Sequence, residues 1–139
     1  MVAIVPVDNV LAKQKRVTLK DMAAFPFLMR EKGSAGREIL DASLDMEQIH
    51  VHPAWESSST QAIVQGVANG LGVAVLPYLL VKKDLEQGNV CQAQLERPIQ
   101  RKLNIIYHRS KYISKGIKTF IDICMEFGAM QKKEEQPNE

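Results

Sequence analysis

The stretch SSSTQAIVQGVANGLGVAVLP, residues 57–77, decides the fold because it predicts a helix with two marked ends followed by a buried strand. Ser58 or Ser59 is the expected N-cap, since a serine hydroxyl accepts hydrogen bonds from the free N–H groups of a first helical turn. Counted from Ser58, Gln61 would complete a Ser-x-x-Gln capping box. The helix is therefore expected to begin at these serines.

The apolar residues that follow recur with a period near 3.6 and predict one buried helix face. They are Ile63, Val64, Val67, Ala68 and Leu71. Gln65 and Asn69 fall on the exposed face. Gly70 is expected to end the helix with a positive φ, and Leu71 to fold back as the accompanying hydrophobic contact. The next run, GVAVLP, has no polar alternation and predicts a strand covered on both faces, which is typical of parallel sheets under helices.

Composition favours a soluble, cytoplasmic protein with one core. The chain has 139 residues, of which 45% are hydrophobic and 24% charged. No apolar run approaches the roughly 20 residues that span a bilayer, and the N-terminus lacks the basic start and long apolar centre of a signal peptide. The net charge of +2 is too small for nucleic-acid binding by electrostatics alone. Cys91 and Cys124 have no metal or redox spacing and are expected to be free thiols.

The order of the remaining segments predicts a doubly wound α/β unit with right-handed crossovers and a parallel three-stranded core. The predicted strands are VAIVPV (2–7), FPFLMR (25–30) and QIHVHPAW (48–55), and the predicted helices lie at 18–24, capped by Thr18, and at 37–46. After Pro77, the patterns predict a polar helix at 79–89, a loop at 90–100, a strand RKLNIIYHR (101–109), a helix at 114–127 and a polar tail.

A candidate binding site lies where two helix starts follow strands, because ligands in open α/β sheets bind beyond the carboxyl ends of the strands. Hydroxyls and free N–H groups at those starts favour anions. The candidate effector-binding residues are Gly33, Ser34, Ser58, Ser59, Thr60 and Pro77, and the nearby cations are Arg30, Lys32 and Arg37. Alternatively, the serines only cap helices.

No catalytic, metal or cofactor site is predicted, so the chain is not expected to be an enzyme. His50 and His52 lie on one face of a predicted strand, but no third ligand follows at a recognisable spacing. Ser34 stands in GSAG, which lacks the Gly-x-Ser-x-Gly elbow of serine hydrolases.

The motif order resembles the effector-binding domain of LysR-type transcriptional regulators. The blocks that carry the resemblance are VPVDNVLAKQKRVTLKDM, FPFLMREKGSAGREIL, STQAIVQGVANGLGVAVLP, and RKLNIIYHRS with SKGIKTFIDIC. The most specific is VANGLGVAVLP, and the similarity extends to about Phe127.

The resemblance implies a fold like that of type II periplasmic binding proteins, with two α/β lobes, crossing hinge strands and an effector in the cleft. It divides the chain into a hinge strand and connection (1–24), effector-binding lobe II (25–95), a returning hinge strand with a C-terminal helix of lobe I (96–128), and a flexible tail (129–139). It also implies that Met1 begins a fragment without the helix-turn-helix and the first half of lobe I.

The function implied by the resemblance is sensing of a small, anionic metabolite, contacted by Ser34 and Ser58, to control DNA binding by the absent helix-turn-helix. The alternative is a solute-binding lobe of a transport-associated protein. A homodimer is expected, because part of lobe I is missing and one helix stripe would lose its partner. That stripe comprises Ile117, Phe120, Ile121, Cys124 and Phe127.

Overall fold

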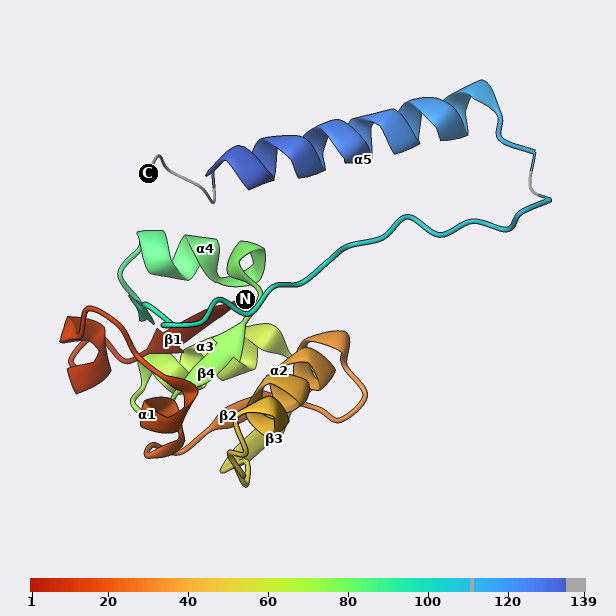
Figure 1. Cartoon of the computed structure of the whole chain (residues 1–139). Helices are drawn as coiled ribbons and strands as arrows, with labels where there is room; N and C mark the ends of the chain where they lie inside the picture. Colours follow the sequence, from red (N-terminus) through yellow and green to blue (C-terminus); the bar gives the residue numbers. More distant parts are fainter. Residues whose placement is uncertain (111, 135–139) are drawn as a thin grey trace. The chain divides into compact units, whose positions relative to one another are not determined.

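The computed structural model describes residues 1–110 and 112–134. The chain forms two compact units, Met1–Arg101 and Lys102–Glu139 (Figure 1). Within the described residues, all strands lie in the first unit, and the second holds one long helix.

The strands of the first unit form two small sheets. They are β1 (Val2–Val5), β2 (Leu28–Arg30), β3 (Trp55–Ser57), β4 (Ala74–Leu76) and β5 (Cys91–Ala93). β1 lies between β4 and β5 and is antiparallel to both, whereas β2 and β3 are parallel. A parallel bridge between Phe27 and Val73 joins β2 to β4. The prediction that the first three strands run parallel is therefore wrong for β1, whose neighbours come from the end of the unit.

Helices cover both faces of these strands. They are η1 (Val10–Lys13), α1 (Leu19–Ala23), α2 (Ala35–Met46), α3 (Thr60–Ala68) and α4 (Tyr78–Glu86). Strand residues alternate between two buried clusters, so that Ala3 packs with Leu40 of α2 while Ile4 packs with Ile63 of α3. This two-sided covering confirms the predicted doubly wound α/β class.

The decisive helix, α3, begins one residue later than a capping box would require. Its N-cap is Ser59, whose hydroxyl accepts from the Ala62 N–H at 3.2 Å. Ala62 therefore occupies the position that Gln61 was predicted to hold, and the Ser58–Gln61 box is wrong. The shift follows from β3, which continues through Ser57 and leaves Ser58 as the connection.

The end of α3 is a Schellman motif, as the two N–H···O bonds show. The Gly70 N–H donates to Val67 O at 2.9 Å, and the Leu71 N–H donates to Gly66 O at 3.0 Å. Gly70 has φ +77°, which confirms the predicted stop. Leu71, however, is 58% exposed and not buried as predicted. In a Schellman motif, the side chain in the place of Leu71 contacts the residue in the place of Gly66. Gly66 has no side chain, so this contact cannot form.

Replacing Gly70 by alanine is expected to lower the free energy of unfolding by about 1 kcal/mol, because left-handed backbone is unfavourable for L-residues. No atom lies within 4 Å of a Cβ built there, so backbone strain is the only contribution. Urea denaturation measures the change. Gly70→Asn should lose less, since asparagine tolerates this conformation; equal losses for both variants would contradict the argument.

Two further segments differ from the predictions for residues 48–55 and 90–100. β3 begins at Trp55 instead of ending there, because Gln48 has a positive φ of 56° and Pro53 cannot donate to a ladder. β5 lies inside the predicted loop and pairs through Ala93 with Ala3. Its three residues are too few for a periodic signal.

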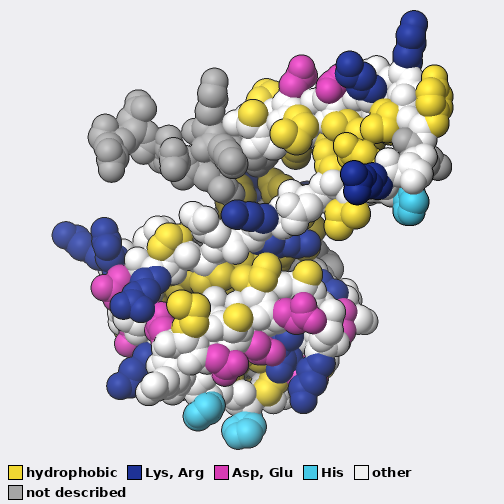
Figure 2. All heavy atoms as spheres, turned by 45° about the vertical axis from the view of Figure 1, so that its right-hand side comes forward, with side chains coloured by type: hydrophobic (Ala, Val, Ile, Leu, Met, Phe, Trp, Pro, Cys, Tyr) yellow, Lys and Arg dark blue, Asp and Glu magenta, His cyan; other side chains and the backbone are white. Residues whose placement is uncertain are grey.

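The second unit contains α5 (Lys115–Glu134), which confirms the predicted helix and extends it into the predicted tail. The predicted strand at 101–109 is not one: its residues are exposed and none belongs to a strand. The apolar stripe of α5 includes the exposed side chains of Phe120 and Phe127. Figure 2 shows hydrophobic side chains gathered along this helix, whereas charges of both signs are interspersed over the visible face of the first unit.

Candidate functional site

A cavity of about 210 Å³ lies at the carboxyl ends of β2 and β4, beside the start of α2. Arg30 ends β2, Leu76 ends β4, and Pro77 follows β4. The first turn of α2 contributes Ser34 through Arg37. The remaining lining residues are Met1, Leu40, Val75, Leu80 and Arg101. Of the two helix starts in the site predicted from the sequence, the cavity includes the one that follows β2.

The start of α2 offers the cavity several hydrogen-bond donors. Ser34 is the N-cap, and its hydroxyl accepts from the Arg37 N–H at 3.2 Å. The backbone N–H groups of Ala35 and Gly36 have no acceptor among the described residues. Because these residues line the cavity, the positive end of the helix dipole and its free donors favour a negatively charged group there.

Arg37 joins three elements beneath this turn and is 6% exposed. Its Nε donates to Asp41 on α2 at 2.8 Å, and its Nη1 donates to Glu56 on β3 at 2.6 Å. Nη1 also donates to the Arg30 carbonyl of β2 at 2.9 Å. Burial lowers the pKa of Arg37, but the hydrogen bonds to Glu56 and Asp41 outweigh burial and raise the pKa above its ordinary value. Arg37 therefore stays charged and fixes α2 against the sheet.

Arg30 connects the cavity wall to the start of α3. Its Nη1 donates to the Thr60 hydroxyl at 2.9 Å. Its Nε and Nη2 donate to the two Glu31 carboxylate oxygens at 2.9 and 3.0 Å. The pKa of Glu31 is lowered chiefly by the hydrogen bonds from Arg30. The guanidinium thus has a bidentate carboxylate partner from the adjacent residue.

The structure brings together part of the predicted site. Ser34 and Pro77 line the cavity, whereas Gly33 precedes the cap with φ +87° and is absent from the lining. Ser58, Ser59 and Thr60 are also absent from it. Ser59 caps α3, and Thr60 contacts the cavity through Arg30. The predicted approach of the Ser34 and Ser58 hydroxyls to within about 10 Å stays a prediction.

Sequence reasoning missed Leu80 and Arg101, which also line the cavity. Arg101 falls within the segment predicted as a strand, so its position gave no signal for a site. Leu80 lies on the segment predicted only as a polar helix, for which no site was proposed. Arg37 was expected to supply charge, but its burial and its ties to three elements depend on tertiary contacts.

Other chemistry is limited in the residues that the structure describes. They contain no group of three or more His, Cys, Asp or Glu side chains able to hold a metal ion. Cys91 and Cys124 are free thiols, as predicted. None of the described helices is long and apolar enough to cross a membrane.

Comparison with protein families decides what kind of domain carries this cavity. The family model described as the LysR substrate binding domain matches residues 1–129. The chain belongs to this family. One similar protein is the uncharacterized HTH-type transcriptional regulator YeiE of Escherichia coli K12, which is 34% identical over 78% of the chain and 37% of that protein. The HTH-type transcriptional activator CmpR of Synechocystis is 30% identical over 88% of the chain and 40% of that protein.

Solved structures show the same LysR fold, which is the type II periplasmic-binding-protein-like α/β fold. The regulatory domain of Synechocystis CcmR, solved in complex with 2-PG, superposes with a TM-score of 0.77 at 26% identity, over 91% of this chain and 61% of that one. The effector-binding domain of QuiR gives a TM-score of 0.72 at 21% identity, over 93% and 61%. The chain spans about two fifths, 37% to 40%, of the two curated LysR relatives.

Proposed function

We propose that this LysR domain binds a small anionic effector in the cavity at the start of α2. In the intact regulator, occupancy of the cavity controls DNA binding by a helix-turn-helix outside this chain. The domain performs no catalysis, and the regulator acts in the cytoplasm. The main support for this proposal is the composition of the cavity wall. The free N–H groups of Ala35 and Gly36 lie there beside three arginines, and none of the described residues that line the wall is a carboxylate.

The comparisons support a regulator over a transport-associated binding protein, although the two share a fold. The curated relatives reported above are HTH-type transcriptional regulators. The CcmR regulatory domain, at 26% identity, was solved with 2-PG, which supports a small-molecule effector for the present chain. The predicted contacts of Ser34 and Pro77 fit the cavity, and those of Ser58 and Ser59 would require a ligand that extends toward α3.

Titration of the ¹⁵N-labelled 139-residue chain with sodium sulfate and sodium acetate tests the anion site. We expect saturable shifts of the Ala35 and Gly36 amide signals, because their N–H groups are the free donors. Ser34→Ala should weaken sulfate binding about tenfold, the effect of losing one hydrogen bond of about 1.5 kcal/mol to a charged group. Ser43→Ala, on the same helix outside the cavity, is the control. Shifts spread over surface amides without saturation would contradict the proposal.

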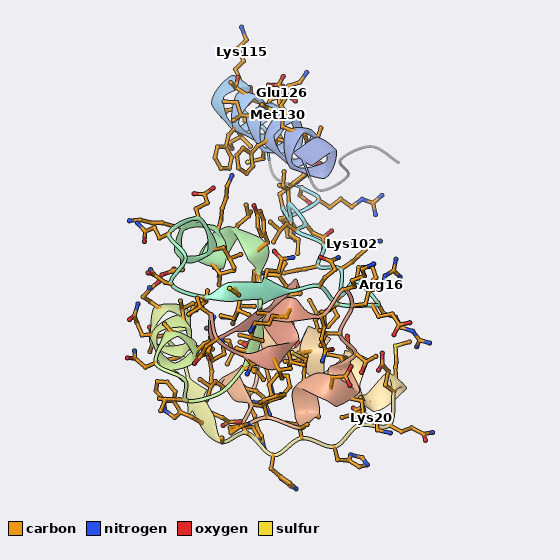
Figure 3. All side chains as sticks on the ribbon, turned by 90° about the vertical axis from the view of Figure 1, so that its left-hand side faces the viewer. Arg16, Lys20, Lys102, Lys115, Glu126 and Met130 are labelled. Atoms are coloured by element: carbon orange, nitrogen blue, oxygen red, sulfur yellow. The ribbon has the colours of Figure 1, made fainter. Side chains whose placement is uncertain are left out.

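We also propose that the chain forms a homodimer through the apolar stripe of α5. Large exposed apolar patches are uncommon on stable monomers, and Phe120 is 65% exposed. Light scattering should therefore give a dimer mass, and Phe120→Asp should shift it to the monomer. Glu126→Lys, on the opposite side of α5, should leave the dimer intact (Figure 3). A monomer at micromolar concentration for the parent chain would contradict this proposal.

A further inference from the structure

The three arginines in the cavity wall differ in how their charge is balanced. Arg30 has Glu31 as a bidentate partner, and Arg37 is paired with both Asp41 and Glu56. Arg101 makes no hydrogen bond or ion pair with any described residue. Arg101 is therefore the cavity arginine that has no carboxylate partner among the described residues.

The neutralising carboxylates themselves do not line the cavity. Glu31 lies in the turn before α2 with its side chain 41% exposed, and Asp41 and Glu56 are 44% and 39% exposed. The cavity wall thus holds arginine residues, while these carboxylates reduce the field of Arg30 and Arg37 from outside the wall. The charge that a ligand experiences depends on these pairings as well as on the number of arginines.

We propose that Arg101 and Glu31 determine which ligand charge the cavity accepts, with Arg101 as the unneutralised cation and Glu31 as the carboxylate that cancels Arg30. This inference rests on the anion site proposed above. It predicts a ligand with a single acidic group at this end of the cavity, since one arginine charge remains without a partner. Removal of Glu31 would release the charge of Arg30 and favour dianions.

Electrostatics gives this proposal a distinctive signature. The interaction energy between a protein charge and a ligand is proportional to the ligand charge, so a change of one protein charge alters log Kd for sulfate about twice as much as for acetate. Arg101→Gln should weaken acetate about threefold and sulfate about tenfold in this partly solvated site. Glu31→Gln should strengthen acetate binding about threefold and sulfate binding about tenfold, because it removes a negative charge.

The test is amide titration of the 139-residue chain with sodium acetate and sodium sulfate at constant ionic strength. Arg97→Gln is the matched control, because Arg97 is an arginine of the same unit that is 82% exposed and outside the cavity wall. Its affinities should equal those of the parent.

The outcomes separate this inference from the proposed function. If neither anion shifts the Ala35 and Gly36 signals of the parent chain, the anion site itself is wrong. If the parent binds there but Arg101→Gln has unchanged affinity, only the present inference is overturned. Equal factors for acetate and sulfate would also overturn it, because they would show a structural effect of the substitution and not a change in field.

Discussion

Gly72→Ala is expected to lower the free energy of unfolding by about 3 kcal/mol, at the upper end of the range for overpacked sites. A Cβ at this buried position would overlap the Pro26 backbone carbonyl, which cannot rotate away as a side chain does. That carbonyl accepts from the Val73 N–H at 2.9 Å, and the Leu28 N–H donates to Val73 O at 2.8 Å. The substitution would therefore push β2 away from β4 and break the connection between the two sheets.

The same change would alter the candidate site, because its wall includes the ends of both strands. Arg30 ends β2 and Pro77 follows β4, so their separation depends on the Pro26–Val73 contact. Urea denaturation measures the stability. Gly70→Ala is the matched control, since it makes the same substitution two positions away in open space. Equal losses at the two positions would show that the carbonyl contact has no special energetic role.

Arg37→Gln is the second substitution with a large expected effect, a loss of about 2 kcal/mol in the free energy of unfolding. Breaking a fully buried charge pair costs about 3 to 5 kcal/mol. The loss here is smaller because the carboxylates of Asp41 and Glu56 are 44% and 39% exposed and remain partly hydrated. The variant leaves both carboxylates, and the Arg30 carbonyl, without their donor.

Two controls test this explanation of the Arg37 effect by urea denaturation. Arg97→Gln removes an arginine that is 82% exposed and 3.9 Å from Glu47, so it should change stability by less than about 0.5 kcal/mol. Adding Glu56→Gln to Arg37→Gln should restore part of the loss, because it removes one unpaired carboxylate. A double variant no more stable than Arg37→Gln alone would contradict the explanation by unpaired carboxylates.

Local interactions were predictable from the sequence because they involve residues a few positions apart. Thr18 caps α1 and forms a capping box with Asp21, whose pKa is lowered mainly by the hydrogen bond from the Thr18 hydroxyl. Ser34 caps α2 in the same way. Gly70 ends α3 by adopting a conformation that glycine accepts most easily. The motif order also identified the family.

The sequence did not predict strand pairings in which a short segment depends on a partner far away in the chain. β5 has three residues and exists because Ala93 and Cys91 pair with β1 at the other end of the first unit. The segment 101–109 shows the opposite error, since its apolar alternation is that of a strand but no described strand pairs with it. Alternation indicates which face of a segment is apolar, and pairing decides whether that segment becomes a strand.

By itself, then, the sequence determined the Thr18 cap of α1, the end of α3 at Gly70, the burial of β4 on both faces and the presence of hydroxyls near a strand edge. The tertiary structure decided which of these hydroxyl-bearing residues lines the cavity. Ser34 is part of the cavity wall, whereas Ser59 is the N-cap of α3 and lies outside the wall. The tertiary structure also brought Arg101 to the same wall as Arg30. The physical reason is that caps and turns are satisfied by neighbours in the chain, whereas a cavity is formed by side chains whose proximity depends on how the strands and helices pack.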